Sequence, residues 1–285
     1  MSANLAFAGE LLPGFERDAR FDQLLAEADR RFRTQPVAPD PAELANRCGL
    51  DPDPWQHQVL CSQAPGILLN CSRQSGKSTV ATYLALWEVL CVPDSLTLIL
   101  SPSERQSKRL FRKVMRGFNR LGRPVTPEIE NKLELELANG SQLYALPASE
   151  GTIRGFDAVS LLLIDEAGDV PDDLYRAVRP MLAVSGGRIV AMGTPKGKRG
   201  WWWREWSGQT EEDDPEGSPE GDWERVEVDA TMCPRIPPAF LAKERRSLGV
   251  FFEQEYMCRF LDAENQIFPT EVVEAAVAGG LDAWF

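Results

Sequence analysis

The sequence predicts an α/β fold in which helices flank a mostly parallel central sheet. Three observations favour this fold. Short apolar segments alternate with helical segments from residue 66 onward, one apolar strand leads through a polar loop directly into a helix, and another apolar strand ends in two acids. Alternating strands and helices are typical of parallel sheets, because parallel neighbours need a crossover connection.

The apolar patterns give the individual elements. The expected strands cover residues 67–70, 95–100, 159–164, 187–192 and 224–229. The expected helices of the core cover residues 78–91, 104–121 and 172–183. Two further strands, 133–137 and 142–146, flank Asn139-Gly140, a dipeptide that favours a tight hairpin turn.

The segments outside this core divide the chain into three predicted parts. Residues 1–50 form an N-terminal helical extension, with helices over 16–32 and 41–48; residues 51–200 form the core; residues 201–285 form a small C-terminal subdomain. That subdomain is expected to hold helices over 238–246, 249–260 and 271–277. Residues 207–222 carry many acids and no base, which indicates an exposed loop.

Composition narrows the classes of function. The formal net charge of −12 argues against a chain that coats nucleic acid by itself. Two clusters, residues 103–123 and 196–204, are locally basic and could bind DNA phosphates, form a solvated face, or contact the acidic loop of another subunit. No apolar stretch approaches the length of a membrane span, and the N-terminus lacks the features of a signal peptide. The scattered cysteines are expected to be free thiols in a reducing compartment, and a single histidine makes a zinc site improbable.

Residues 71–79 read as a phosphate-binding loop between a strand and a helix. The residues expected to bind the nucleotide there are Cys71, Ser72, Arg73, Gln74, Ser75, Gly76, Lys77, Ser78 and Thr79. Lys77 would contact the β- and γ-phosphates, and the Ser78 hydroxyl would ligate Mg²⁺. A chance Gly-Lys-Ser turn is the alternative, and Cys71 in place of the usual first glycine favours it slightly.

The acidic strand makes that alternative much weaker. Asp165 follows Leu161–Ile164 at the carboxyl end of a strand, where it would hold the Mg²⁺ shell, and Glu166 would deprotonate the attacking water. Thr194, after the next strand, could sense the γ-phosphate or simply form a turn. Gln56 could pair with an adenine edge, or be a surface residue beside a core tryptophan.

These motifs together resemble the ATPase domain of the large terminase subunit of tailed bacteriophages. The resemblance rests on Trp55-Gln56, residues 71–79, residues 161–167 and Gly193-Thr194-Pro195-Lys196-Gly197, and it extends from about residue 50 to 268. Phosphate-binding loops of that family commonly carry Arg-Gln before the final glycine, as Arg73-Gln74 do here. The resemblance implies a P-loop NTPase fold of the ASCE type, with ATP and Mg²⁺ as cofactors.

The resemblance also implies the roles of residues and the partners. It implies that Lys77 and Ser78 bind phosphate and Mg²⁺ and that Asp165 ligates Mg²⁺. It also implies that Glu166 is the catalytic carboxylate, that Thr194 couples hydrolysis to motion, and that Gln56 binds adenine. Two arginines compete for the transition state: Arg73, acting within its own subunit, and Arg154, reaching a neighbour's ATP. The implied partners are double-stranded viral DNA, a portal protein and a small terminase subunit, in a homo-oligomeric ring within the bacterial host cytoplasm, with a monomer in isolation as the alternative.

Other functions stay open at the level of sequence. Large terminases usually carry a second, nuclease domain, for which this sequence has too few residues, so no DNA cleavage is expected. A helicase or translocase would show further motifs after the acidic strand. A nucleotide-gated assembly module without turnover would not need Glu166 beside Asp165.

Overall fold

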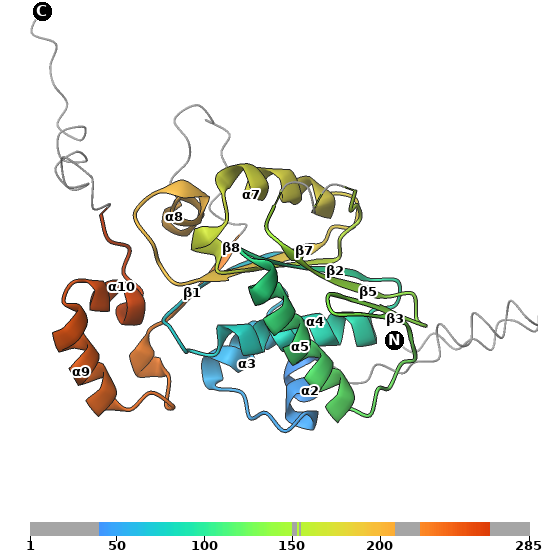
Figure 1. Cartoon of the computed structure of the whole chain (residues 1–285), viewed down its shortest axis with the longest axis horizontal. Helices are drawn as coiled ribbons and strands as arrows, with labels where there is room; N and C mark the ends of the chain where they lie inside the picture. Colours follow the sequence, from blue (N-terminus) through green and yellow to red (C-terminus); the bar gives the residue numbers. More distant parts are fainter. Residues whose placement is uncertain (1–39, 150–152, 154, 209–222, 263–285) are drawn as a thin grey trace, which may run out of the picture.

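The computed structural model describes residues 40–149, 153, 155–208 and 223–262, and within them one eight-stranded sheet organises the chain (Figure 1). The strand order is β3-β4-β5-β2-β6-β7-β1-β8. Neighbours from β5 to β8 are parallel, whereas β3–β4 and β4–β5 are antiparallel. The strands are β1 (Gly66–Cys71), β2 (Leu96–Ser101), β3 (Pro127–Glu130), β4 (Glu134–Leu137), β5 (Gln142–Pro147), β6 (Leu161–Asp165), β7 (Arg188–Gly193) and β8 (Trp223–Val228).

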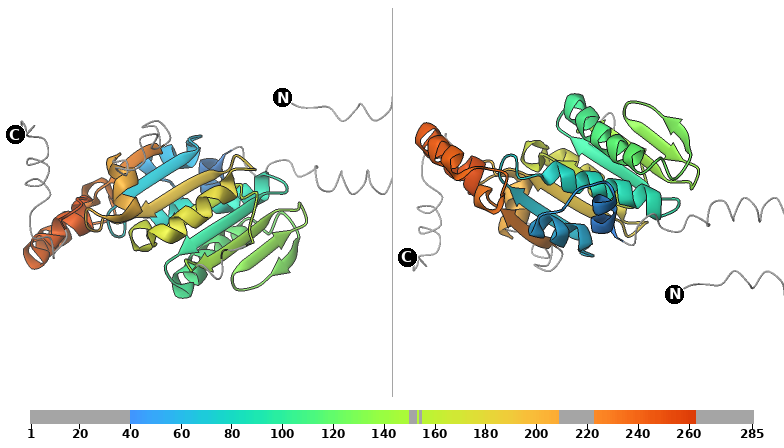
Figure 2. Two further views of the ribbon diagram at one scale, coloured as in Figure 1. Left: turned by 90° about the horizontal axis from the view of Figure 1, so that it is seen from above. Right: turned by 90° about the horizontal axis from the view of Figure 1, so that it is seen from below.

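Helices cover both faces of this sheet (Figures 1 and 2). Helices α2 to α5 lie on one face and α7 and α8 on the other, while α9 and α10 lie beyond the β1–β8 edge. The α-helices are α2 (Pro41–Arg47), α3 (Pro54–Cys61), α4 (Lys77–Cys91), α5 (Glu104–Arg120), α7 (Asp172–Val178), α8 (Gly200–Ser207), α9 (Pro238–Leu248) and α10 (Phe251–Met257).

The two helical layers explain why the central strands are apolar along their whole length. In β6, Leu163 packs toward the α4–α5 side and Leu162 toward the α7–α8 side. Because successive side chains of a strand point to opposite faces, a strand covered on both faces needs apolar residues at every position. The fold class predicted from this pattern is confirmed.

The predicted hairpin is present and is extended by a strand that the sequence pattern did not reveal. Between β4 and β5, Gly140 has φ +83°, and the Asn139 side chain donates to Val89 O at 2.9 Å. β3, at the sheet edge, is mostly exposed. Half-exposed edge strands need no apolar run, so their sequence signal is weak.

Two predicted helices are shorter than expected. The helix predicted over 172–183 ends at Val178 and continues as a 3₁₀ turn, Arg179–Leu182, because Pro180 lacks an N–H and cannot continue an α-helix. The helix predicted over 249–260 ends at Met257, since Cys258 takes a left-handed conformation with φ +59°. The segment 201–207, given no element in the sequence, forms most of α8.

The predicted parts of the chain are joined by sheet pairing and helix packing. β8, from the predicted C-terminal part, pairs with β1 throughout, and α2, from the predicted N-terminal part, packs on α4. The predicted helices over 16–32 and 271–277, and the acidic loop beyond residue 208, lie outside the described residues. Among the helices of the described part, none is long and apolar enough to cross a membrane.

Candidate nucleotide-binding site

The loop after β1 has the backbone of an anion-binding loop. It runs from Ser72 to Gly76, and α4 begins at Lys77. Gly76 has φ +106°, and a Cβ there would lie 2.6 Å from Nε2 of Gln56, so only glycine fits. The loop therefore presents backbone N–H groups at the start of a fifteen-residue helix, where the helix dipole favours a phosphate.

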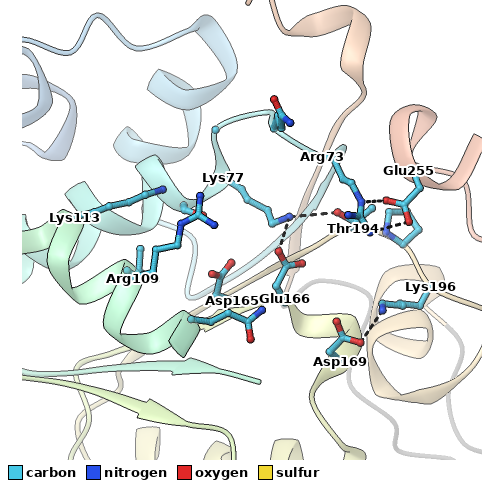
Figure 3. A pocket seen from close by; sticks show the side chains of 16 residues that line it. Arg73, Lys77, Arg109, Lys113, Asp165, Glu166, Asp169, Thr194, Lys196 and Glu255 are labelled. Atoms are coloured by element: carbon cyan, nitrogen blue, oxygen red, sulfur yellow. Dashed lines mark hydrogen bonds and ion pairs between the residues drawn. The ribbon is translucent and has the colours of Figure 1, made fainter. Parts of the chain in front are cut away.

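Three elements bring polar side chains to this loop (Figure 3). Nζ of Lys77 lies 3.2 Å from Oε1 of Glu166, and it donates to Oγ1 of Thr194 at 3.3 Å. Lys77 starts α4, whereas Glu166 follows β6 and Thr194 follows β7. Because β6, β7 and β1 are parallel neighbours, their carboxyl ends meet at one edge of the sheet.

Asp165 is the buried carboxylate of the site. It is the last residue of β6 and is 7% exposed, and its Oδ1 has no hydrogen-bond partner in the described part of the chain. Burial, and next the Glu166 carboxylate, raise the pKa of Asp165 to about 6. A buried carboxylate oxygen without a donor, close to a second acid, suits a hard divalent cation, so Asp165 and Ser78, which both line the cavity, are residues that could hold Mg²⁺.

We expect the Asp165→Asn substitution to stabilise the protein in a pH-dependent way when nucleotide and Mg²⁺ are absent. The folded pKa lies above the ordinary 3.8, so the stability linked to this group is full below about pH 3.8 and is lost as pH rises through 6. At pH 7.5 the buried charge costs up to about 3 kcal/mol, and Asn removes that cost.

Urea unfolding with EDTA present, at pH 5 and pH 7.5, measures this effect. The gain of Asp165→Asn should be larger at pH 7.5 than at pH 5. Asp157→Asn, at an exposed position, is the matched control. An equal change at both pH values would contradict the role of burial.

Arg73 is held at the wall of the site by the C-terminal helices. Its guanidinium makes a two-point contact with the Glu255 carboxylate, with Nη2 to Oε1 at 3.1 Å, and its backbone N–H donates to Glu255 O at 3.0 Å. Glu255 belongs to α10, so this pair joins the loop to the segment beyond the sheet edge. In Figure 3, Arg73 points toward Glu255 and not toward Glu166.

A second arginine ties the same loop to the start of α3. Arg235 contacts both carboxylate oxygens of Asp53, at 2.8 and 2.6 Å, and donates to Ser75 O at 3.1 Å. Gln56 is buried and its Oε1 accepts from the backbone N–H of Asp53 at 3.0 Å, which caps α3. The acceptor oxygen of Gln56 is therefore already engaged within the chain. Its contact with adenine stays a prediction.

The loop, strand ends and α5 enclose a cavity of about 700 Å³. The residues that line it are Arg73, Gln74, Gly76, Lys77, Ser78, Gln106, Arg109, Leu110, Lys113, Asp165, Glu166, Asp169, Thr194, Pro195, Lys196 and Glu255. Most predicted site residues are in this set. The predicted residues that do not line the cavity are Gln56, Cys71, Ser72, Ser75 and Thr79.

Two of the predicted site residues, Cys71 and Arg154, need separate mention. The Cys71 side chain is fully buried at the end of β1, where burial raises the pKa of its thiol to about 12, so any contact with a nucleotide would come from its backbone. Arg154 lies outside the described residues, and its predicted role as a finger stays a prediction.

Several cavity residues were missed by the sequence motifs. Arg109 and Lys113 of α5 belong to a basic run that the sequence offered as a DNA-binding face. Asp169 and Glu255 lie beside or within segments that resemble the family, but neither was given a role, because their approach to the cavity depends on packing across the fold. In the second basic cluster, Lys196 pairs with Asp169, Lys198 with Asp262 and Arg204 with Asp172.

A phosphate-binding loop beside a strand that ends in paired acids, at the edge of a parallel α/β sheet, defines a P-loop NTPase. The model of the family "Terminase large subunit, T4likevirus-type, N-terminal" matches residues 68–274. The chain therefore belongs to the terminase large subunit family.

Relatives of known sequence agree with this assignment. The terminase large subunit of Escherichia phage T5 is 26% identical over 203 residues, which cover 70% of this chain and 44% of that protein. The large subunit of Thermus phage G20c is 26% identical over 250 residues, covering 77% and 51%. The chain thus spans about half the length of these relatives.

A solved structure gives the same fold. The Thermus phage P74-26 large terminase ATPase domain superposes with a TM-score of 0.66 at 23% identity, covering 76% of this chain and 97% of that domain. At this identity the likeness concerns the fold.

Proposed function

We propose that this chain is the ATP-hydrolysing motor domain of a terminase large subunit, which drives double-stranded DNA into a procapsid. The observation that carries the proposal is the convergence of Lys77, Asp165 and Glu166 on one cavity, from α4 and β6. Family membership supports the packaging role. The large terminase of a thermophilic bacteriophage, which shares this fold at 14% identity, has been solved in complex with ATP-γ-S, which supports ATP as the ligand.

The proposed reaction assigns each residue a task. Lys77 binds the phosphate chain as a point charge, and its contact with Glu166 gives way when the nucleotide enters. Glu166 then accepts the proton of the attacking water. Thr194, whose Oγ1 lies 3.3 Å from the Lys77 ammonium, has the task of sensing the loss of the terminal phosphate and transmitting the change to β7. Asp165 and Ser78 would hold Mg²⁺, which neutralises phosphate charge when bound.

The wider assembly belongs to the same proposal. The domain acts in a homo-oligomeric ring with a portal protein and a small terminase subunit, in the cytoplasm of the bacterial host. A pure nucleotide-gated assembly module is disfavoured, because binding alone does not require Glu166 beside the Asp165 carboxylate.

Steady-state ATPase activity of the chain with Mg²⁺ tests the proposal. Lys77→Ala should lower turnover at least about 100-fold and weaken ATP binding, because a charge-assisted phosphate contact is lost. Lys243→Ala, which removes an exposed lysine of α9, should behave as wild type. Wild-type protein without ATPase activity, or a Lys77→Ala protein with full activity, would contradict it.

A further inference from the structure

Some of the cationic side chains that line the cavity have carboxylate partners, and others do not. Three of its cations have carboxylate partners: Lys77 with Glu166, Arg73 with Glu255, and Lys196 with Asp169. Two cations remain, Arg109 and Lys113, and in the described part of the chain neither makes a hydrogen bond or an ion pair. The positive charge still available to an incoming anion therefore comes from α5.

Helix geometry places these two cations together. Arg109 and Lys113 are four residues apart, so their side chains lie one turn apart on the same face of α5. Figure 3 shows both side chains beside Lys77, on the side of the cavity away from Arg73 and Glu255. The opposite face of α5 is anchored by buried residues such as Phe111 and Val114, which fixes the orientation of the helix.

The surroundings of Lys113 make it unfavourable for the Lys113 ammonium and the Arg109 guanidinium to lie together without an anion. Lys113 is half-buried, and burial, followed by the nearby Arg109 guanidinium, lowers the pKa of its ammonium. The Asp165 carboxylate, which lines the same cavity, offsets part of this effect on the Lys113 pKa. An anion bound between the two cations would reduce their mutual repulsion and would give each of them a hydrogen-bonding partner of opposite charge.

We propose that Arg109 and Lys113 form an anion subsite that binds phosphate oxygens opposite Arg73. This inference rests on the proposed function for the identity of the anion. The oxygens belong either to the phosphate chain of the bound nucleotide or to inorganic phosphate on its way out after hydrolysis. A cavity of about 700 Å³ has the size of a small-molecule site, so the phosphates of a DNA duplex are the disfavoured partner.

The experiment compares Arg109→Gln, Lys113→Gln and the double variant with wild type. The matched control is Arg105→Gln, which removes an exposed arginine of the same helix that does not line the cavity. Two quantities are measured: the Kd of ATP by calorimetry, without Mg²⁺ so that no hydrolysis occurs, and the inhibition constant of inorganic phosphate in steady-state turnover. Arg109→Lys, which keeps the charge, should retain most of the wild-type affinity.

We expect the double variant to raise one or both of these constants about ten-fold, the size of one charge-assisted contact. A weaker ATP Kd identifies the nucleotide as the source of the oxygens. A higher phosphate inhibition constant with unchanged ATP Kd identifies the released phosphate.

Two results would overturn the subsite. One is a double variant that matches Arg105→Gln in both constants. The other is a double variant that keeps both constants at their wild-type values and, in a parallel titration with double-stranded DNA, weakens DNA binding. Lys77→Ala separates this inference from the proposed function: if it abolishes turnover while the double variant changes nothing, only the subsite is wrong.

Discussion

Replacing Glu166 with glutamine should leave ATP binding close to wild type and lower ATP turnover by about 10²–10⁴-fold. Glutamine keeps the size of the side chain but cannot accept the proton of the attacking water. It also removes the ion pair between Glu166 and Lys77, which frees the lysine for phosphate. Turnover is followed by phosphate release, and binding by calorimetry.

Glu128→Gln, at an exposed position of β3, supplies the same chemical change away from the site. It should match wild type in both measurements. A Glu166→Gln protein that hydrolyses ATP at the wild-type rate would remove Glu166 from catalysis, and Asp169, which also lines the cavity, would become the next carboxylate to test.

Replacing Arg154 with alanine should lower ATP turnover by about 10³–10⁵-fold, the range of an arginine finger. We favour Arg154 over Arg73 for this role because the Arg73 guanidinium already has a two-point contact with Glu255. A finger that acts between subunits predicts that turnover depends on protein concentration. It also predicts that mixing Arg154→Ala with Lys77→Ala subunits restores part of the activity.

The comparison with Arg73→Ala decides between the two arginines. If Arg73 acts within its own subunit, its loss should abolish turnover and mixing with Lys77→Ala subunits should restore nothing, because both lesions affect the same loop. An Arg154→Ala protein with wild-type turnover at every concentration would rule out a finger at that position.

The parts of the site that lie in continuous motifs could be predicted from the sequence. Gly76-Lys77 after an apolar strand predicts a loop at a helix start, and the glycine is required by its φ of +106°. Asp165 ends, and Glu166 follows, a strand that is apolar because helices cover both of its faces. Each inference needs only local backbone geometry and the burial of one strand, so neighbouring residues carry all the information.

Other features could not be reached in this way, because they depend on contacts across long stretches of chain. Arg73 and Glu255 meet although they are 182 residues apart, and Lys77 and Thr194 meet across 117 residues. The basic run of α5 looks like a nucleic-acid face in sequence, yet Arg109 and Lys113 line the nucleotide cavity.

The sequence by itself determined the fold class, the phosphate-binding loop and the acids that end β6, because strand burial and loop geometry are local properties. The tertiary structure decided which cations of α5 reach the cavity and which acid holds Arg73. Those outcomes follow from the order of strands in the sheet, from the packing of α5 on one face of it and from the position of α10 beyond its β1–β8 edge, none of which a short segment encodes.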